Sequence, residues 1–578
     1  MFDVLWKLKW FFKENWLRYT TAITLLFIAN ILEIIPPWLI GIAIDSIAQG
    51  ELTAELMWQY IAVLGISMVL AYLINFVWQY QLFGGAYVIE RQLRSSLMGH
   101  FLKMTPTFYE KNRTGDLMAR ATNDLKAISE TAGFGILTLV DSTLYMATII
   151  VAMGVLVSWE LTFLAMIPLP ILAIVVQMLG KKIHARYIEA QEAFGDMNDS
   201  VLESVGGVRV IRAYVQERAS EKQFADMTDD VYEKNMAVER IDALFAPVTK
   251  VLTSISYMVG LGYGAFLVAE GTMTLGDLVA FNVYLGMIVW PMFAIGELIN
   301  ILQRGNASLD RVNETLDYPE DVTDPSDPVK TGRPERIGFK DFSFTYPQSS
   351  SINLQGINLS MNSGQTLGIV GKTGSGKTTF VKQLMREYPT GQGSILMNGI
   401  ELKKLSKDQL RSWIGYVPQD HVLFSRTIRE NILFGKSNAS EEELIEALRL
   451  SYFKKDLALL PNGLDTLVGE KGVALSGGQK QRISIARALI KNPEILILDD
   501  SLSAVDAKTE ARIIENIQAE RSGKTTIITT HRLSAVKHAD WIVVLDDGKI
   551  IEEGTHDDLL KTKGWYNEQF LRQQIEEV

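Results

Sequence analysis

Long apolar stretches alternate with charged loops through the first half of the chain. Six of them lie near residues 19–44, 56–83, 133–157, 161–180, 244–269 and 278–302. A helix of about 20 apolar residues crosses the ~30 Å hydrocarbon core of a bilayer. A buried helix of a globular domain would explain one such stretch, but not six. The pattern therefore predicts six transmembrane helices in a lipid bilayer, and Pro168, Pro170 and Pro291 are expected to bend theirs.

Basic residues predict the orientation of these helices. The short loops at 45–55, 158–160 and 270–277 contain no Lys or Arg, whereas the long loops at 90–130 and 181–242 contain many. Cytoplasmic loops carry the excess of Lys and Arg. Both long loops and both chain termini are therefore predicted to be cytoplasmic.

Three cytoplasmic segments have a pattern of their own. The N-terminal MFDVLWKLKWFFKENW alternates lysines with Trp and Phe, which predicts an amphipathic helix on the membrane surface. The two long loops are rich in helix formers and poor in turn signals, so each is predicted to be two helices that continue the spans by ~30 Å. Their tips, near 108–120 and 212–224, could contact a cytoplasmic domain; a solvated helical hairpin is the alternative.

Four charged residues lie at or near membrane depth: Glu33, Asp141, Lys250 and Glu297. A charge in lipid is expensive, so each is expected to face a protein interior or a water-filled cavity. Contact with a cationic substrate is one interpretation. A polar lining of a wet cavity, or a position close to the interface, is the favoured one.

The second half of the chain has a different pattern. Residues 317–334, DYPEDVTDPSDPVKTGRP, are rich in Pro and Asp and lack apolar periodicity, which is typical of a linker. Short β-rich runs then alternate with helical stretches, which predicts an α/β domain. The predicted organisation is a membrane domain at 1–316, a linker at 317–334 and an α/β domain at 335–578.

Composition excludes several classes of chemistry. The 578 residues include no cysteine, so disulfides, thiolate metal sites and cysteine nucleophiles are absent. The net charge of −11 argues against a nucleic-acid partner. Residues 335–578 carry as many basic as acidic residues, so the acidic excess lies entirely before them.

The motif GKTGSGKT, Gly371 to Thr378, follows the apolar strand TLGIV and precedes the helical run TFVKQLM. Glycines let backbone N–H groups close around a polyphosphate at a helix N-terminus. Lys377 would reach the β- and γ-phosphates of ATP, and Thr378 would ligate Mg²⁺. The residues assigned to the nucleotide here are Gly371, Lys372, Thr373, Gly374, Ser375, Gly376, Lys377, Thr378 and Thr379.

Two further strands end in candidate catalytic residues. The strand EILILDD ends in Asp499 and Asp500. Asp499 fits the carboxylate that holds Mg²⁺ through water, and the next position is where a carboxylate would polarise the attacking water. His531 follows the strand TTIITT and could donate to the γ-phosphate, although a surface histidine is the ordinary alternative.

A second anion-binding device is LSGGQKQR, residues 475–482, in which a serine and two glycines open a helical run. The chain thus has two phosphate sites but only one lysine-bearing loop. This makes sense if two such domains face each other and each completes the nucleotide site of the other.

Together, these motifs resemble the ATPase domain of ABC transporters, and the six spans resemble the membrane half of an ABC exporter. The resemblance covers essentially the whole chain. It implies an α-helical membrane domain of ABC exporter fold, followed by an α/β P-loop ATPase domain that uses ATP and Mg²⁺.

The resemblance also assigns roles to single residues. Tyr346 would stack on adenine, Gln419 would contact Mg²⁺, Asp506 would bridge two nucleotide sites, and His531 would be the switch histidine. In the signature segment Leu475–Gln479, the residues assigned to the γ-phosphate of the opposite subunit are Ser476, Gly477, Gly478 and Gln479. Residues 108–121 and 213–224 match the coupling helices, and Glu470 matches a segment near them.

One position departs from the family pattern. The residue after the Mg²⁺ aspartate is usually glutamate, and here it is Asp500. Aspartate is one methylene shorter, and a misplacement of ~1 Å can cost ~100-fold in rate. The site built on this chain's own phosphate loop is therefore expected to bind ATP but to hydrolyse it poorly. The signature segment is intact and would complete a competent site on another subunit.

This combination resembles the heterodimeric multidrug ABC exporters of Gram-positive bacteria. The resemblance implies ATP-driven efflux of hydrophobic or amphipathic drugs across the cytoplasmic membrane, with a second half-transporter that supplies the catalytic glutamate. A lipid or peptide exporter, a homodimer in which Asp500 suffices, and an ATP-gated channel remain alternatives. Six spans contradict a soluble ABC ATPase acting on nucleic acid.

Overall fold

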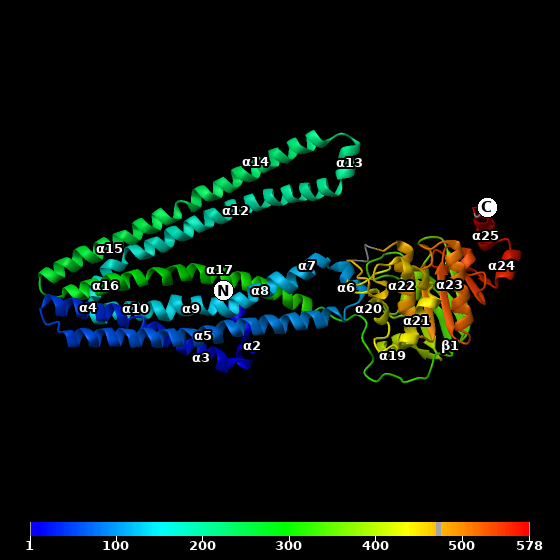
Figure 1. Cartoon of the computed structure of the whole chain (residues 1–578), viewed down its shortest axis with the longest axis horizontal. Helices are drawn as coiled ribbons and strands as arrows, with labels where there is room; N and C mark the ends of the chain where they lie inside the picture. Colours follow the sequence, from blue (N-terminus) through cyan, green and yellow to red (C-terminus); the bar gives the residue numbers. More distant parts are fainter. Residues whose placement is uncertain (1, 470–474, 577–578) are drawn as a thin grey trace. The chain divides into compact units, whose positions relative to one another are not determined.

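The computed structural model describes residues 2–469 and 475–576. The chain forms two compact units (Figure 1). We call residues 1–101 and 115–318 the helical unit, and residues 102–114 and 319–578 the α/β unit.

The helical unit consists of α-helices and π-helical turns. It begins with α1 (Asp3–Lys7), α2 (Lys9–Glu14), α3 (Trp16–Leu32), α4 (Ile35–Ala48) and α5 (Ala54–Phe101). A second run contains α7 (Thr114–Ala119), η1 (Arg120–Asp124), α8 (Leu125–Glu130), η2 (Thr131–Gly135), α9 (Ile136–Val140), η3 (Asp141–Tyr145), α10 (Met146–Ala152), η4 (Met153–Ser158) and α11 (Trp159–Met166). It ends with α12 (Pro168–Gly206), α13 (Val208–Ala213), α14 (Glu217–Asp242), α15 (Phe245–Ala269), α16 (Leu275–Met287) and α17 (Val289–Leu316).

Long apolar helices are the main feature of this unit. Within the described residues, the helical runs that are long and apolar enough to cross a membrane are Trp16–Ala48, Ala54–Phe101, Thr114–Met166, Glu217–Ala269 and Leu275–Leu316. They contain five of the six predicted stretches. The chain is therefore a multi-pass membrane protein in its first half.

The one remaining predicted stretch, 161–180, is divided at Ile167 between α11 and α12. Pro168 lacks the N–H that would continue the α11 hydrogen-bond ladder, so the helix breaks where the sequence predicts a bend. A second break, at Ile288, lies between α16 and α17, and Pro291 follows it in the first turn of α17.

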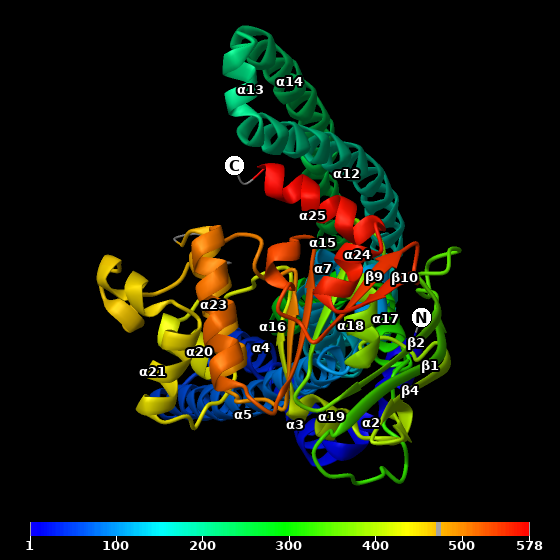
Figure 2. The same cartoon turned by 90° about the vertical axis from the view of Figure 1, so that its right-hand side faces the viewer.

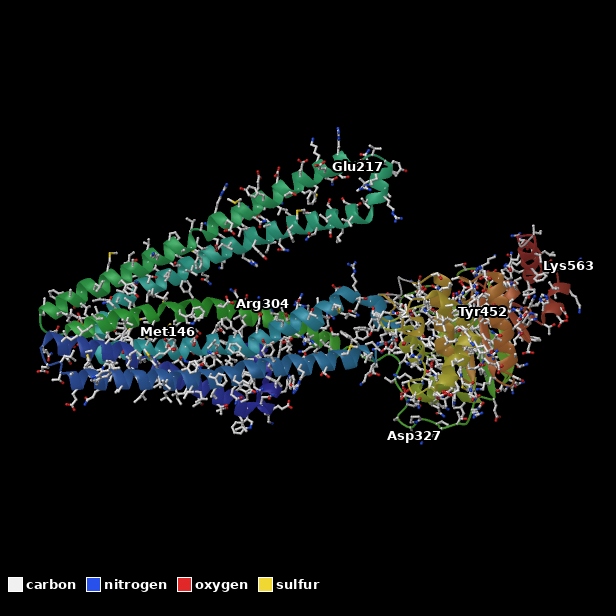
Figure 3. All side chains as sticks on the ribbon, viewed as in Figure 1. Met146, Glu217, Arg304, Asp327, Tyr452 and Lys563 are labelled. Carbon is white, nitrogen blue, oxygen red and sulfur yellow. The ribbon has the colours of Figure 1, made fainter. Side chains whose placement is uncertain are left out.

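The two long loops are helical, as predicted. Helix α5 continues to Phe101, well past the end of its apolar stretch. Helices α12 and α14 lie side by side along their length and are joined by α13 (Figures 1 and 2), with Glu217 at the start of α14 (Figure 3). The second predicted tip, 212–224, thus runs from the end of the short helix α13 into the first two turns of α14.

The N-terminal segment, predicted to be one amphipathic helix, forms two short helices, α1 and α2. Val4, Leu8 and Phe11 follow a helical spacing and are fully buried in one core that also contains Leu309 and Val312 of α17. The opposite face exposes the large side chains Trp6 and Trp10. A lysine on the same helices, Lys7, forms an ion pair with Asp310 of α17 at 2.5 Å. The segment is therefore attached to α17 by its apolar stripe and presents tryptophan outward.

The α/β unit contains two sheets. Its strands are β1 (Arg336–Phe344), β2 (Leu354–Asn362), β3 (Thr366–Gly371), β4 (Gln392–Met397), β5 (Ile400–Glu401), β6 (Ile414–Val417), β7 (Ile495–Asp499), β8 (Thr525–Thr530), β9 (Trp541–Asp546) and β10 (Lys549–Gly554). Four strands pair antiparallel in the order β2-β1-β4-β5, and six form a sheet in the order β10-β9-β3-β8-β7-β6.

Helices flank these sheets. The α-helices are α6 (Pro106–Lys111), α18 (Lys377–Leu384), α19 (Lys407–Trp413), α20 (Ile428–Leu433), α21 (Glu441–Leu450), α22 (Gly477–Leu489), α23 (Ala507–Glu520), α24 (His556–Lys561) and α25 (Trp565–Glu576). The 3₁₀ turns are η5 (Leu402–Lys404), η6 (Lys454–Leu459), η7 (Gly463–Asp465) and η9 (Leu533–Ala535).

The order of the larger sheet positions the site. Strands β6, β7, β8, β3 and β9 are parallel, so their carboxyl ends meet at one edge. Every residue of β7 and β8 is buried, as expected for parallel strands covered on both faces. Ligands of open parallel sheets bind at the carboxyl ends of the strands, so this edge is where a site is expected.

The backbones of α4 and α16 are in close contact in the helical unit. A Cβ at Gly276 would lie 2.0 Å from the carbonyl oxygen of Gly41, and a Cβ at Gly41 would lie 2.8 Å from that of Gly276. Asp45 of α4 accepts hydrogen bonds from the Thr274 hydroxyl (2.7 Å) and the Gly276 N–H (2.8 Å), which caps α16. Only glycine permits this approach, in the manner of other small-residue contacts between membrane helices.

We therefore expect Gly276→Ala to separate α4 from α16 and to destabilise the helical unit by about 1–3 kcal/mol. Thermal unfolding of the full chain in detergent would show an apparent melting temperature several degrees below that of the wild type. The matched control is Gly262→Ala on α15, where an added Cβ meets nothing within 4 Å. Equal melting temperatures for the two variants would contradict the role of this contact.

Candidate functional site

The phosphate loop connects β3 to α18 at the carboxyl edge of the sheet. Gly374 and Gly376 have φ values of +85° and +105°, which an L side chain rarely adopts. A Cβ at Gly376 would also lie 2.9 Å from the carbonyl oxygen of Asn353. The glycines therefore form a narrow turn whose backbone N–H groups open toward the N-terminus of α18, as a polyphosphate site requires.

The side chains of this loop fit an anion with a bound cation. The Lys377 ammonium donates to the carbonyl oxygens of Gly371 (2.8 Å) and Lys372 (2.9 Å), so it is held against the loop. Burial lowers the pKa of Lys377, and the carboxylates of Asp500 and Asp499 act in the opposite direction. The Ser375 hydroxyl is buried and has no hydrogen-bond partner within the described part of the chain, so it is available to a ligand.

Asp499 lies fully buried at the end of β7 with both carboxylate oxygens engaged. Oδ1 accepts from the Thr378 hydroxyl at 3.0 Å and from the Thr529 hydroxyl at 2.6 Å. Oδ2 accepts from the Tyr416 hydroxyl at 3.2 Å. Burial, together with the charge of Asp499, raises the pKa of Tyr416, so its phenol remains a donor. This set of oxygens beside Thr378 suits a hard divalent cation.

Tyr416 and Thr529 were not found by sequence reasoning. Each lies on a strand next to β7, Tyr416 on β6 and Thr529 on β8. Strand order alone brings them to Asp499, and a single sequence gives no signal for that order.

Asp500 and His531 contact each other. Asp500 has a left-handed backbone (φ +45°), and its Oδ1 lies 3.0 Å from Nδ1 of His531. The carboxylate is one-fifth exposed and the imidazole about one-half exposed. Both follow carboxyl ends of strands, β7 and β8, so the sequence placed them correctly at the edge of the site.

Tyr346 and Gln419, two other residues assigned to the nucleotide and its Mg²⁺, also lie in the α/β unit. The Tyr346 ring is half-buried, and its hydroxyl donates to Thr379 Oγ1 in the first turn of α18 at 3.1 Å. Gln419 is exposed two residues after β6. The side chain of Thr373, in the phosphate loop, is exposed.

The signature segment lies at the N-terminus of α22. Ser476 and Gln479 form a reciprocal capping box there, with Gln479 N–H donating to the Ser476 hydroxyl at 3.3 Å. A Cβ at Gly478 would lie 3.2 Å from the carbonyl oxygen of Ala504, and Asp506 caps α23 two residues later. The segment therefore packs on the loop that carries Asp506.

The signature segment and the phosphate loop share no hydrogen bond within residues 2–469 and 475–576. The chain thus carries two separate candidate anion-binding sites at helix N-termini. The phosphate loop contains a lysine, Lys377, and the signature segment Leu475–Gln479 contains none. Glu470, the other residue assigned from the family resemblance, lies outside the described residues.

The charged residues of the membrane helices are arranged in two ways. The Tyr145 hydroxyl donates to Glu33 at 2.6 Å, and the Trp290 indole donates to Asp141 at 3.1 Å. Protein donors therefore satisfy these two acids, as expected of polar groups inside a helix bundle. Lys250 and Glu297 are exposed on the helical unit.

Both halves of the chain match known families. Residues 19–292 match the ABC transporter transmembrane region, and residues 354–503 match the ABC transporter family. The chain is 62% identical over 575 residues to the probable multidrug resistance ABC transporter ATP-binding/permease protein YheI of Bacillus subtilis (strain 168), covering 100% of this chain and 98% of the relative.

A more distant relative and a solved structure extend the comparison. The ATP-dependent lipid A-core flippase of Syntrophus aciditrophicus (strain SB) is 33% identical over 557 residues, covering 95% of this chain and 91% of the flippase. The structure of a bacterial Atm1-family ABC exporter with ATP bound superposes with a TM-score of 0.78 at 26% identity, covering 96% of this chain and 98% of the exporter.

The family resemblance inferred from the motifs and the predicted fold class are thereby confirmed over the full length of the chain. A helical membrane region precedes a domain with a mainly parallel sheet, and this domain matches the ABC transporter family over residues 354–503. The chain therefore belongs to the ABC transporter family, as an ATP-hydrolysing transporter with its membrane and ATPase regions on one polypeptide.

Proposed function

We propose that this chain is one half of a heterodimeric exporter that uses ATP to move hydrophobic or amphipathic drugs out across the cytoplasmic membrane. The multidrug resistance relative supports the cargo, since it aligns over the full chain. The observation that carries the asymmetry is the position of Asp500, one residue after Asp499 and hydrogen-bonded to His531. Both termini and the long helical extensions would face the cytoplasm, in agreement with the distribution of Lys and Arg.

Roles follow for the residues around the phosphate loop. Lys377 would contact the β- and γ-phosphates, and the loop N–H groups with Ser375 would surround them. Mg²⁺, held by Thr378, Asp499 and Gln419, would neutralise phosphate charge. Tyr346 would stack on the adenine base, beside the first turn of α18.

Asp500 is the reason to expect slow hydrolysis at this site. Its carboxylate lies 3.0 Å from His531 and is one methylene shorter than that of the usual glutamate. A general base must lie within about 2.6–3.2 Å of the water that it activates. A carboxylate drawn back toward His531 would polarise that water poorly, and a ~1 Å error in position costs ~100-fold. ATP would remain bound at this site and act mainly to hold two subunits together.

The signature segment would complete the competent site. Ser476, Gly477 and Gly478 lie at a helix N-terminus that shares no hydrogen bond with this chain's own phosphate loop in the described residues. It would meet the γ-phosphate on the loop of the partner, whose glutamate would activate the water. Asp506 would bridge the two sites. Hydrolysis there would reset the membrane helices after they have opened outward.

A lipid exporter is the second candidate, and it would consist of two identical subunits if Asp500 is sufficient as a base. The full-length similarity to a lipid flippase favours it. In that case two identical sites would turn over, and the two devices of this chain would be equally important.

Substitutions in the two devices distinguish these functions. In the complex that this chain forms with its co-purifying subunit, Lys377→Ala should leave a substantial part of the steady-state ATPase rate, because it affects only the slow site. Gly477→Asp should reduce that rate by ~100-fold or more, since it places a carboxylate where the γ-phosphate of the competent site would lie.

The matched control is Gly477→Ala, whose added Cβ meets only Ala504 at 3.8 Å and should retain most of the activity. Equally complete loss of turnover in Lys377→Ala and Gly477→Asp would contradict the asymmetry and favour the identical-subunit exporter.

The donors to Asp499 give a further prediction. Tyr416→Phe removes only the hydroxyl that holds Oδ2, and Thr529→Val removes one that holds Oδ1. Each should raise the Mg²⁺ concentration needed for half-maximal ATP binding by about three- to tenfold, because a charge-assisted hydrogen bond orients the carboxylate. ATP binding in EDTA should not change. Tyr452→Phe, two residues after α21, is the control. A Mg²⁺ dependence like that of the wild type in both site variants would refute the positioning role.

A further inference from the structure

Tyr388 is a buried phenol that joins two parts of the α/β unit that are far apart in sequence. It follows α18 by four residues and is 2% exposed. Its hydroxyl donates to Oε1 of Glu110 at 2.5 Å, across 278 residues of sequence. Burial, followed by the hydrogen bond and charge of Glu110, raises the pKa of Tyr388, so the phenol stays protonated as the donor.

Glu110 belongs to α6, the short helix of the first predicted tip. This segment is attached firmly to the α/β unit. Thr107 and Phe108 are almost fully buried, and the Thr105 hydroxyl, just before α6, donates to Asp321 at 2.6 Å. A displacement of α6 would therefore carry the Glu110 carboxylate with it.

The other side of Tyr388 faces Tyr346. The two rings meet edge to face, with centroids 4.8 Å apart and an interplanar angle of 81°. Phe344 contacts the Tyr346 ring in the same way at 5.0 Å, and the Tyr346 hydroxyl donates to Thr379. The orientation of the Tyr346 ring thus depends on Phe344, Thr379 and Tyr388, and Tyr388 is in turn hydrogen-bonded to α6.

We propose that Tyr388 is a positioning residue for Tyr346, and that Glu110 fixes Tyr388, so that α6 controls how tightly the base of the nucleotide is held. The inference rests on the proposed stacking of Tyr346 on adenine. It concerns the base alone, because the phosphate contacts of Lys377 and Thr378 lie on the other end of α18 and do not involve Tyr388. Movement of α6 would then change the affinity for ATP without changing the affinity for a bare polyphosphate.

The test compares ATP with inorganic triphosphate, which has the phosphates but no base. Both are titrated against the full chain in lipid nanodiscs by displacement of a fluorescent nucleotide. Tyr388→Phe keeps the ring and removes the hydroxyl. It should weaken ATP binding about three- to tenfold and leave triphosphate binding unchanged, as expected for loss of one charge-assisted bond that orients an aromatic contact.

Glu110→Ala should lower the affinity for ATP as much as Tyr388→Phe does. The double variant should bind ATP no more weakly than either single variant, because both substitutions remove the same hydrogen bond. Glu110→Gln, which keeps an acceptor oxygen, should recover part of the ATP affinity. Asp116→Ala on α7, an exposed acid of the same tip, is the control and should bind as the wild type does.

Two results would overturn the proposal in different ways. If Tyr388→Phe weakens ATP and triphosphate equally, or neither, Tyr388 does not act through the base. If Tyr346→Ala also leaves the ratio of the two affinities unchanged, the stacking role of Tyr346 itself is wrong. If Tyr346→Ala lowers the affinity for ATP relative to triphosphate but Tyr388→Phe changes neither affinity, only the link between Tyr346 and α6 is refuted.

Discussion

The buried carboxylate of Asp499 is the interaction on which the α/β unit depends most. It has no exposure to solvent, and donors from α18, β6 and β8 engage both of its oxygens. A buried charge is tolerated only when its hydrogen bonds are satisfied, so these elements must close around the end of β7 for the domain to fold. The same closure places Thr378 beside a carboxylate, so the arrangement that satisfies the buried charge is also the proposed cation site.

Asymmetry enters at the next residue. Asp500 leaves the strand in a left-handed conformation and contacts His531, while the signature helix, which packs on the loop of Asp506, makes no hydrogen bond to the phosphate loop in the described part of the chain. Under the proposed function, Asp500 would be a poor base, whereas the signature segment would be intact, so the two properties of this chain would be separable. The proposed pairing with a different subunit uses both properties. The partner would supply a catalytic glutamate, and the signature segment at the N-terminus of α22 would complete the nucleotide site of the partner.

Much of this organisation could be predicted from the sequence, because it depends on local patterns. Apolar length predicts the membrane helices, Pro168 and Pro291 predict their breaks, and glycine spacing predicts the phosphate loop. The contacts of Tyr416 and Thr529 with Asp499 could not be predicted, since they require the strand order of the sheet. Nor could the bond between Tyr388 and Glu110, which joins residues 278 positions apart and has no local signal.

The most direct test of the proposed asymmetry is the Mg·ATP turnover of this chain purified alone in lipid nanodiscs, with its mass measured in the same sample. Turnover near background is the predicted result, because Asp500 should polarise water poorly and no partner glutamate is present. A dimer of this chain that hydrolyses ATP at ~1 s⁻¹ or faster, within the ordinary range of enzymes, would contradict it. Such a rate would mean that Asp500 suffices as the base and that two identical subunits make the transporter.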